Sequence, residues 1–155
     1  MLLLPKLDRS IREFQQTIQV PEYDVVIDKL LRKAGELNIP MSFWGENYSM
    51  AEYCAAEDCE SEYRILIRRT ASSGNRKELV YDMIHEMGHC LDPLKLGLVN
   101  KGDAKLMLAR EQRAWAAADE EFDSYPELQP DIAEYTGYKN SCLAVYTRRA
   151  KQSSH

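Results

Sequence analysis

The stretch LVYDMIHEMGHCLDP, residues 79–93, places two of the three histidines of the chain four residues apart, with a glutamate directly after the first. Apolar residues recur through it at steps of four, three and four: Val80, Ile84, Met87 and Leu91. This spacing predicts an amphipathic helix, on which His85 and His89 share one face with their Cβ atoms about 5–6 Å apart. Two imidazoles so placed can bind one tetrahedral Zn²⁺. The alternative is an ordinary structural helix that happens to carry histidines.

The glutamate of this H-E-x-x-H pattern is suited to a role other than metal binding. Successive residues of a helix are about 100° apart, so Glu86 need not be a ligand. Its carboxylate can instead act as general base toward a water molecule that the metal activates. Gly88 costs a helix about 1 kcal/mol relative to alanine, which predicts a close approach by another part of the chain; simple tolerance of a glycine is the alternative.

A third ligand is expected on the next helix. His155 is a poor candidate because chain termini are usually mobile. A second apolar stripe runs at helical spacing through Leu108, Trp115, Ala118 and Phe122, and Glu111 occupies the missing position in it. Burial of a carboxylate is costly unless it is paired or bound to a metal. Glu111 is therefore predicted to complete the site, with a pair to Arg110 or Arg113 as the alternative.

Further residues are candidates for supporting roles. Asp82 and Asp92 each lie three residues from one of the two histidines, where a carboxylate can orient a ligand imidazole; as the alternative, both are solvated carboxylates on the helix face. Tyr135 or Tyr138 is a candidate for stabilising an oxyanion.

Length and composition limit the class of protein. A chain of 155 residues with 45% hydrophobic and 29% charged residues fits one globular domain. With 20 basic and 25 acidic residues the net charge is −5, so neither nucleic acid nor a membrane is an expected partner. The apolar start of the chain stops at Pro5, which does not fit a signal peptide. The four cysteines form no C-x-x-C pair, and free thiols in a reducing cytoplasm are the simplest interpretation.

The order of patterns along the chain predicts an α+β fold. Residues 1–37 are expected to form N-terminal helices, and residues 126–150 a C-terminal helix. Three short segments rich in aromatic and β-branched residues predict a small three-stranded antiparallel sheet: MSFWG (41–45), YSMAEYCAAE (48–57) and EYRILIRRT (62–70). The last of these is a candidate edge on which an extended substrate pairs. The histidine helix is expected from about Asn75 to Asp92, and the glutamate helix from about Asp103 to Phe122.

Together these pieces resemble the ImmA/IrrE family of small zinc metallopeptidases, which share the gluzincin plan of an HExxH helix followed by a helix that bears a glutamate. The family-like segments are YDMIHEMGHCLD and LAREQRAWAAADEE, preceded by IPMSFWG to RILIRRT, which is similar to the small sheet of that fold. Ala114 matches a small residue that the family has three places after the glutamate ligand. Trp115 departs from the pattern, because many members have an aspartate there. The resemblance covers about residues 38–122, the expected core of a single domain spanning 1–155.

The resemblance implies a cytoplasmic zinc-dependent endopeptidase of the minimal zincin type. His85, His89 and Glu111 would hold Zn²⁺, and Glu86 would be the catalytic base. The substrate would be a protein or peptide, and family members with an assigned role cleave transcriptional repressors. The alternative function is a catalytically silent protein of this fold that regulates a partner through protein–protein contact.

Overall fold

The computed structural model describes residues 4–54, 61–94 and 102–153. The helices are α1 (Leu4–Ile18), α2 (Asp24–Glu36), α3 (Lys77–Cys90), α4 (Ala104–Asp123) and α5 (Ile132–Gln152), with 3₁₀ turns η1 (Pro21–Tyr23) and η3 (Pro126–Asp131). The strands are β1 (Met41–Trp44), β2 (Met50–Tyr53) and β3 (Tyr63–Arg68). This confirms the α+β class and the predicted order of elements. Cys59 and His155 lie outside the described residues.

The sheet is mixed, so the prediction of a wholly antiparallel sheet is wrong in one pairing. The strand order is β1-β3-β2; β2 pairs antiparallel with β3, whereas β1 runs parallel to β3 with Met41 opposite Ile65. Strand β3 pairs with β2 on one side and with β1 on the other, so β3, the last strand in sequence, is the central strand of the sheet. Residues 62–70 are therefore not the edge on which a substrate could pair, and β2 is an edge strand instead.

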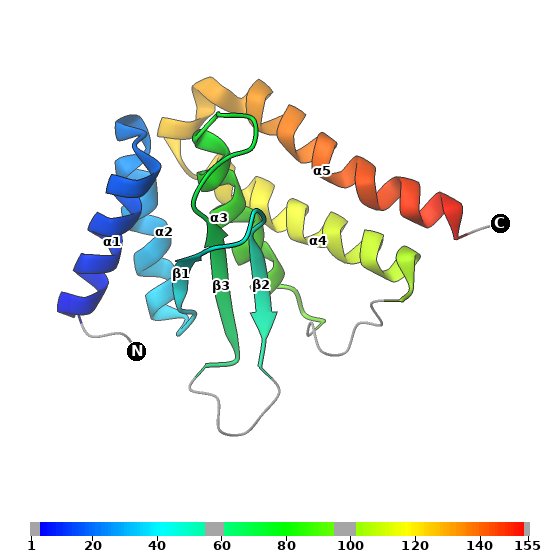
Figure 1. The fold of residues 1–155 in the computed structure, drawn as a ribbon, viewed down its shortest axis with the longest axis horizontal. Coiled ribbons are helices and arrows are strands. Elements are labelled where there is room, and N and C mark those ends of the chain that lie inside the picture. Colours follow the sequence, from blue (N-terminus) through cyan, green and yellow to red (C-terminus); the bar gives the residue numbers. More distant parts are fainter. Residues whose placement is uncertain (1–3, 55–60, 95–101, 154–155) are drawn as a thin grey trace.

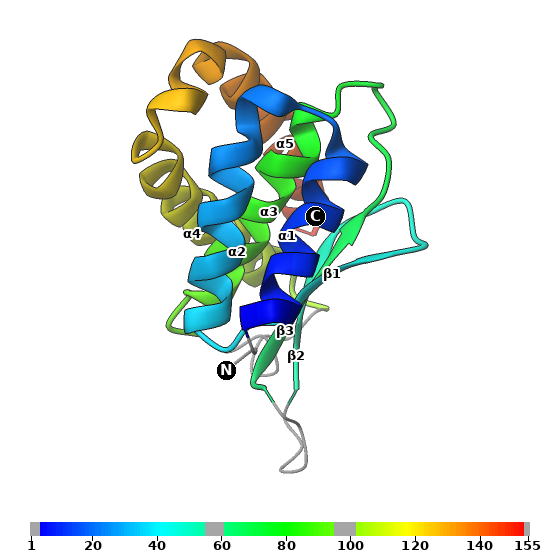
Figure 2. The same cartoon turned by 90° about the vertical axis from the view of Figure 1, so that its left-hand side faces the viewer.

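Helix α3 occupies the middle of the fold. It contacts α1, α2, α4, α5, β2 and β3, and Figures 1 and 2 show it between the sheet and α4. The central position explains why its residues from Leu79 to His89 are all buried, rather than one stripe alone. Helix α1 covers the sheet on β1, where the rings of Phe14 and Phe43 stack 4.1 Å apart. The site helix is thus held from several sides.

Hydroxyl and carboxylate groups join η1, α3 and α5 at one end of the core. The Tyr23 hydroxyl donates a hydrogen bond to Oδ2 of Asp131 at 2.5 Å, and its oxygen lies 3.1 Å from that of Tyr81. Tyr81 in turn donates to Glu134. Lys77 Nζ approaches the same Asp131 oxygen at 3.1 Å. Burial is the main cause that raises the pKa of both tyrosines, so both hydroxyls stay protonated and act as donors here.

Two findings bear on the environment of the protein. Among the described residues, no helix combines the length and the apolar character that crossing a membrane requires.

Cys54 is disulfide-bonded, so the prediction that all four cysteines are free thiols is wrong for this residue. Cys90 and Cys142 are free. The spacing of the cysteines did not indicate this disulfide, because the sequence contains no C-x-x-C pair.

The Asp131 cluster predicts a pH-dependent contribution to stability. The hydrogen bond from Tyr23 and the Lys77 charge hold the pKa of Asp131 below its ordinary value, although partial burial opposes this. A carboxyl whose pKa is lowered by folding stabilises the fold above its unfolded value of about 3.9, and that contribution is lost as the pH falls through the folded pKa. We expect the D131N variant to be less stable than wild type at pH 6, with a gap that narrows below pH 4. Urea unfolding at several pH values measures the difference in free energy of unfolding between wild type and D131N. A difference independent of pH would contradict a stabilising role of the charged Asp131.

Candidate metal centre

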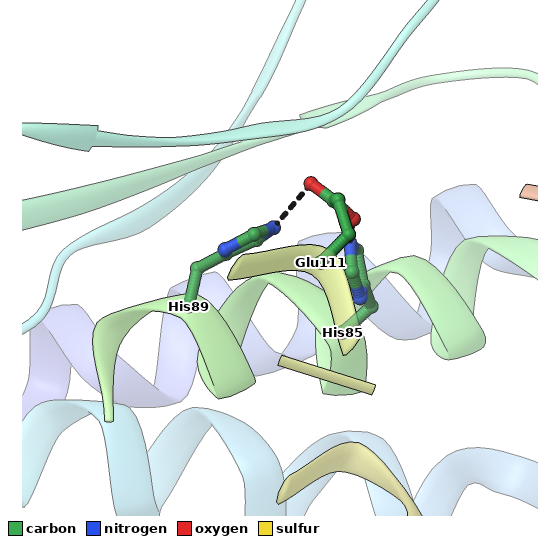
Figure 3. A group of neighbouring side chains, drawn as sticks. All are labelled: His85, His89 and Glu111. Atoms are coloured by element: carbon green, nitrogen blue, oxygen red, sulfur yellow. Dashed lines mark ion pairs between the residues drawn. The ribbon is translucent and has the colours of Figure 1, made fainter. Parts of the chain in front are cut away.

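The three predicted ligands converge in the structure. His85 and His89 project from α3, and Glu111 reaches them from α4, with its carboxylate facing both rings (Figure 3). Nε2 of His85 lies 3.0 Å from one Glu111 oxygen, and Nε2 of His89 lies 2.9 Å from the other. One ligand atom from each residue can be chosen so that all lie within 4.8 Å of one another. The three residues that helical spacing predicted to lie together are thus in contact in the structure.

This donor set fits a zinc ion. Two imidazole nitrogens and one carboxylate oxygen are the protein ligands of one common type of catalytic zinc site, which leaves a fourth position open. All three side chains are buried, at 9%, 6% and 5% exposure for His85, His89 and Glu111. Both histidines direct Nε2 toward the point of convergence, as two residues four apart on a helix must to share one ion.

Close packing of α3 on α4 brings Glu111 to the histidines. A Cβ atom added to Gly88 would lie 2.3 Å from the backbone oxygen of Ala114, a distance that no real side chain tolerates. Gly88 therefore allows the two helix backbones to touch, as its cost within a helix predicted. Ala114 is itself fully buried and presents only a methyl group beside this contact. The helix spacing that the site needs depends on these two small residues.

The arginines beside Glu111 bind another carboxylate, which rules out the alternative pairing for Glu111. Nε of Arg113 lies 3.1 Å from both oxygens of Asp92, and Nη1 of Arg110 lies 3.6 Å from one of them. Arg110 is fully buried and also donates to the backbone oxygen of Leu94 at 2.8 Å. Asp92 therefore ties the end of α3 to α4, which corrects both predictions for it: it neither orients an imidazole nor lies in water.

Asp82 also has a role that the sequence did not predict. Its side chain accepts hydrogen bonds from Arg68 Nε at 2.8 Å, from Ser49 at 2.7 Å and from Tyr138. The Arg68–Asp82 pair is buried, with side-chain exposures of 10% and 9%. Asp82 thus joins α3 to β3, α5 and the segment before β2, and is neither a partner of an imidazole nor a solvated group. The sequence did not predict this cluster because its members lie far apart in the chain.

The charges of the site act on one another. Burial disfavours the charged form of His85, but the hydrogen bond to Glu111 and the charges of Glu86 and Glu111 outweigh it, so the pKa of His85 is raised. Burial likewise disfavours the Glu111 carboxylate, yet its two hydrogen bonds to the imidazoles hold its pKa below the usual range. Burial raises the pKa of Glu86 to about 7, in the range that suits a general base. Its Oε1 lies 3.9 Å from Nε2 of His85.

A cleft of about 990 Å³ gives access to these residues. Its walls come from β2 and the residues before it, from α3, α4 and α5. The hydroxyls of both predicted tyrosines are engaged, that of Tyr135 by Asp119 at 2.8 Å and that of Tyr138 by Asp82. Tyr146 of α5, which sequence reasoning missed, lines the cleft close to Glu111, and burial raises the pKa of its phenol to about 12. A neutral phenol in this position can donate a hydrogen bond to a ligand.

Comparisons with models of protein families, with curated proteins and with solved structures found no match to this chain. Assignment of a function therefore depends on the residues of the site and on the chemistry that they can perform.

The contact at Gly88 gives a prediction with a built-in control. G88A should destabilise the protein by roughly 1–3 kcal/mol or more, because the new methyl group must push α3 away from α4, and it should weaken zinc binding. The same change at Gly137 of α5, where an added Cβ meets nothing within 4 Å, should stabilise by up to about 1 kcal/mol. Urea unfolding of both variants measures the difference. Equal effects of the two substitutions would contradict the close contact.

Proposed function

We propose that this protein is a zinc-dependent endopeptidase of the ImmA/IrrE type. The observation that carries the proposal is the convergence of His85, His89 and Glu111 at one point, with the buried Glu86 carboxylate beside it and a cleft open to them. A peptidase needs a metal site with a free position, a base and access for a polypeptide. The convergence of the three side chains, the Glu86 carboxylate and the cleft support each of these requirements.

Each residue has a distinct task in this proposal. His85, His89 and Glu111 hold the ion, which when bound supplies a Lewis acid that polarises a carbonyl group and activates water. Glu86 accepts a proton from the attacking water and delivers it to the leaving amine, a role that its raised pKa favours. The buried Arg68–Asp82 pair keeps α3 in register with the sheet.

The shape of the cleft supports a polypeptide substrate. Strand β2 pairs with β3 on one side only among the described strands, and its residues Met50 and Ala51 line the cleft. The other edge of β2 can pair with an extended chain through main-chain hydrogen bonds. Side chains from α4 and α5 line the same cleft. A substrate that extends along β2 past the metal position would be cut within its length, which favours an endopeptidase.

The substrate and the compartment follow from the resemblance. The proposed substrate is a protein, with a transcriptional repressor as the first class to test, and the proposed compartment is the cytoplasm, where Cys90 and Cys142 would remain reduced. The disulfide of Cys54 is the observation that favours an oxidising compartment instead. Counting free thiols in protein alkylated during cell lysis decides between them, since a reduced Cys54 supports the cytoplasm.

A second candidate function is a regulatory binding protein without catalysis. It is favoured by the two contacts of Glu111 with imidazoles. These contacts offset the cost of burying the carboxylate, so its burial does not require a catalytic role. Such a protein would keep its effect on a partner when Glu86 is altered, whereas a peptidase would lose it.

The E86Q variant tests the proposed function. Glutamine keeps the shape of the side chain but cannot accept a proton, so we expect cleavage of a mixed peptide library to fall by about 10²–10⁴-fold, with zinc content unchanged. The matched control is E120Q, which alters an exposed carboxylate of α4 outside the cleft lining and should retain activity. Mass spectrometry of the peptides measures cleavage. Zinc-loaded wild type that cuts no peptide, or E86Q that cuts as fast as wild type, would contradict the proposal.

A further inference from the structure

We propose that Trp115 holds the imidazole of His85 in its metal-binding orientation by ring stacking, in place of a hydrogen-bond acceptor on Nδ1. This inference rests on the proposed metal site and deepens it. It makes Trp115 a positioning residue, which acts on the ion through His85.

The two rings lie face to face. Their centroids are 4.1 Å apart and their planes differ by 22°. Trp115 is 2% exposed and stands one helical turn after Glu111 on α4, so the ligand and the stacked ring come from the same face of one helix. Contact over a whole aromatic face restricts tilting of the imidazole about its bond to the chain, since any tilt would press it into the indole.

No described hydrogen bond fixes the His85 ring from its Nδ1 side. A histidine that binds a metal through Nε2 carries its proton on Nδ1, and usually donates it to a carboxylate, a carbonyl or water that fixes the ring. Nδ1 of His85 is buried without such a partner among the described residues, and the same holds for His89. Asp82 and Asp92, which lie three residues from His85 and His89 respectively, are committed to arginines. Apart from the contact of Nε2 with Glu111 at 3.0 Å, the restraint on the His85 ring among the described residues is therefore packing against the indole.

The indole is itself held by rings and not by its polar group. Its Nε1 is buried without a hydrogen-bond partner in the described part of the chain. Tyr135 and Tyr138 of α5 approach it edge-on, with centroids at 5.9 Å and 6.2 Å and planes at 61° and 78°. Ring contacts thus extend from α5 to the proposed ligand, edge-on between the tyrosines and Trp115 and stacked between Trp115 and His85.

The two histidines differ in whether an aromatic ring stacks on the imidazole. His89 meets His85 edge-on, at 4.7 Å with an angle of 73°, and no described ring stacks on its face. Loss of the indole should therefore disturb one ligand of three. Removal of a group that orients a metal ligand typically costs 10–100-fold in affinity, and we expect a loss of that order for Zn²⁺.

The test compares two substitutions on the same face of α4. W115L removes the ring from His85, whereas F122L removes an equally buried ring that stacks on Tyr135 at 4.0 Å and 17°. Zinc affinity is measured by competition with a chromophoric chelator, and urea unfolding confirms that each variant folds. We expect W115L to bind zinc about 10–100-fold more weakly, F122L to bind as wild type does, and W115F to recover most of the affinity. If W115L fails to fold, W115M replaces it, because methionine fills volume without a ring.

A second measurement tests the stack without metal. An indole over an imidazole shifts the ring protons of His85 upfield in the NMR spectrum of the metal-free protein; we expect this shift in wild type and F122L and its loss in W115L. Equal zinc affinity of wild type and W115L, or an unshifted His85 in wild type, overturns this inference alone. Wild-type protein that binds no zinc overturns the proposed function as well.

Discussion

The contact between the backbones of α3 and α4 is the constraint on which the site depends. Gly88 has no side chain, so the carbonyl oxygen of Ala114 can come within 2.3 Å of the position that a Cβ atom would take. At this helix separation, Glu111 reaches both imidazoles at hydrogen-bonding distance. A wider separation would leave a buried carboxylate without partners, which is among the costliest arrangements in a protein interior. The energetics of the core and the geometry of the site therefore depend on the same two small residues.

Around this contact, paired charges fix the helices from outside the site. Asp92 binds Arg113 and lies near Arg110, which anchors the end of α3 on α4. Asp82 binds Arg68, which anchors the same helix on the central strand. Asp82 lies on α3 and Asp92 lies just after its last residue, each three residues from a histidine, yet each serves to place the helix and not the imidazole. Orientation of the His85 ring is thereby left to the indole that stacks on it.

Much of the fold was predictable because local patterns specify it. Helical periodicity identified α3 and α4, and Glu111 stood out as a charge on an apolar stripe; each is a property of one short segment. The direction of β1 was not predictable, since an alternation of apolar residues is the same for parallel and antiparallel pairing. The partners of Asp82 and the stacking of Trp115 also escaped prediction, because Arg68, Tyr138 and His85 are brought to them only by tertiary packing.

The most direct test of the account is the zinc content of the protein, measured by native mass spectrometry after purification without chelator or added metal. We expect about one zinc per chain in wild type and a clear loss in E111Q. E120Q, which alters an exposed carboxylate on the same helix, should keep its zinc. Wild type without zinc even after zinc is offered, or an E111Q variant that retains it fully, would contradict the claim that His85, His89 and Glu111 form a metal centre.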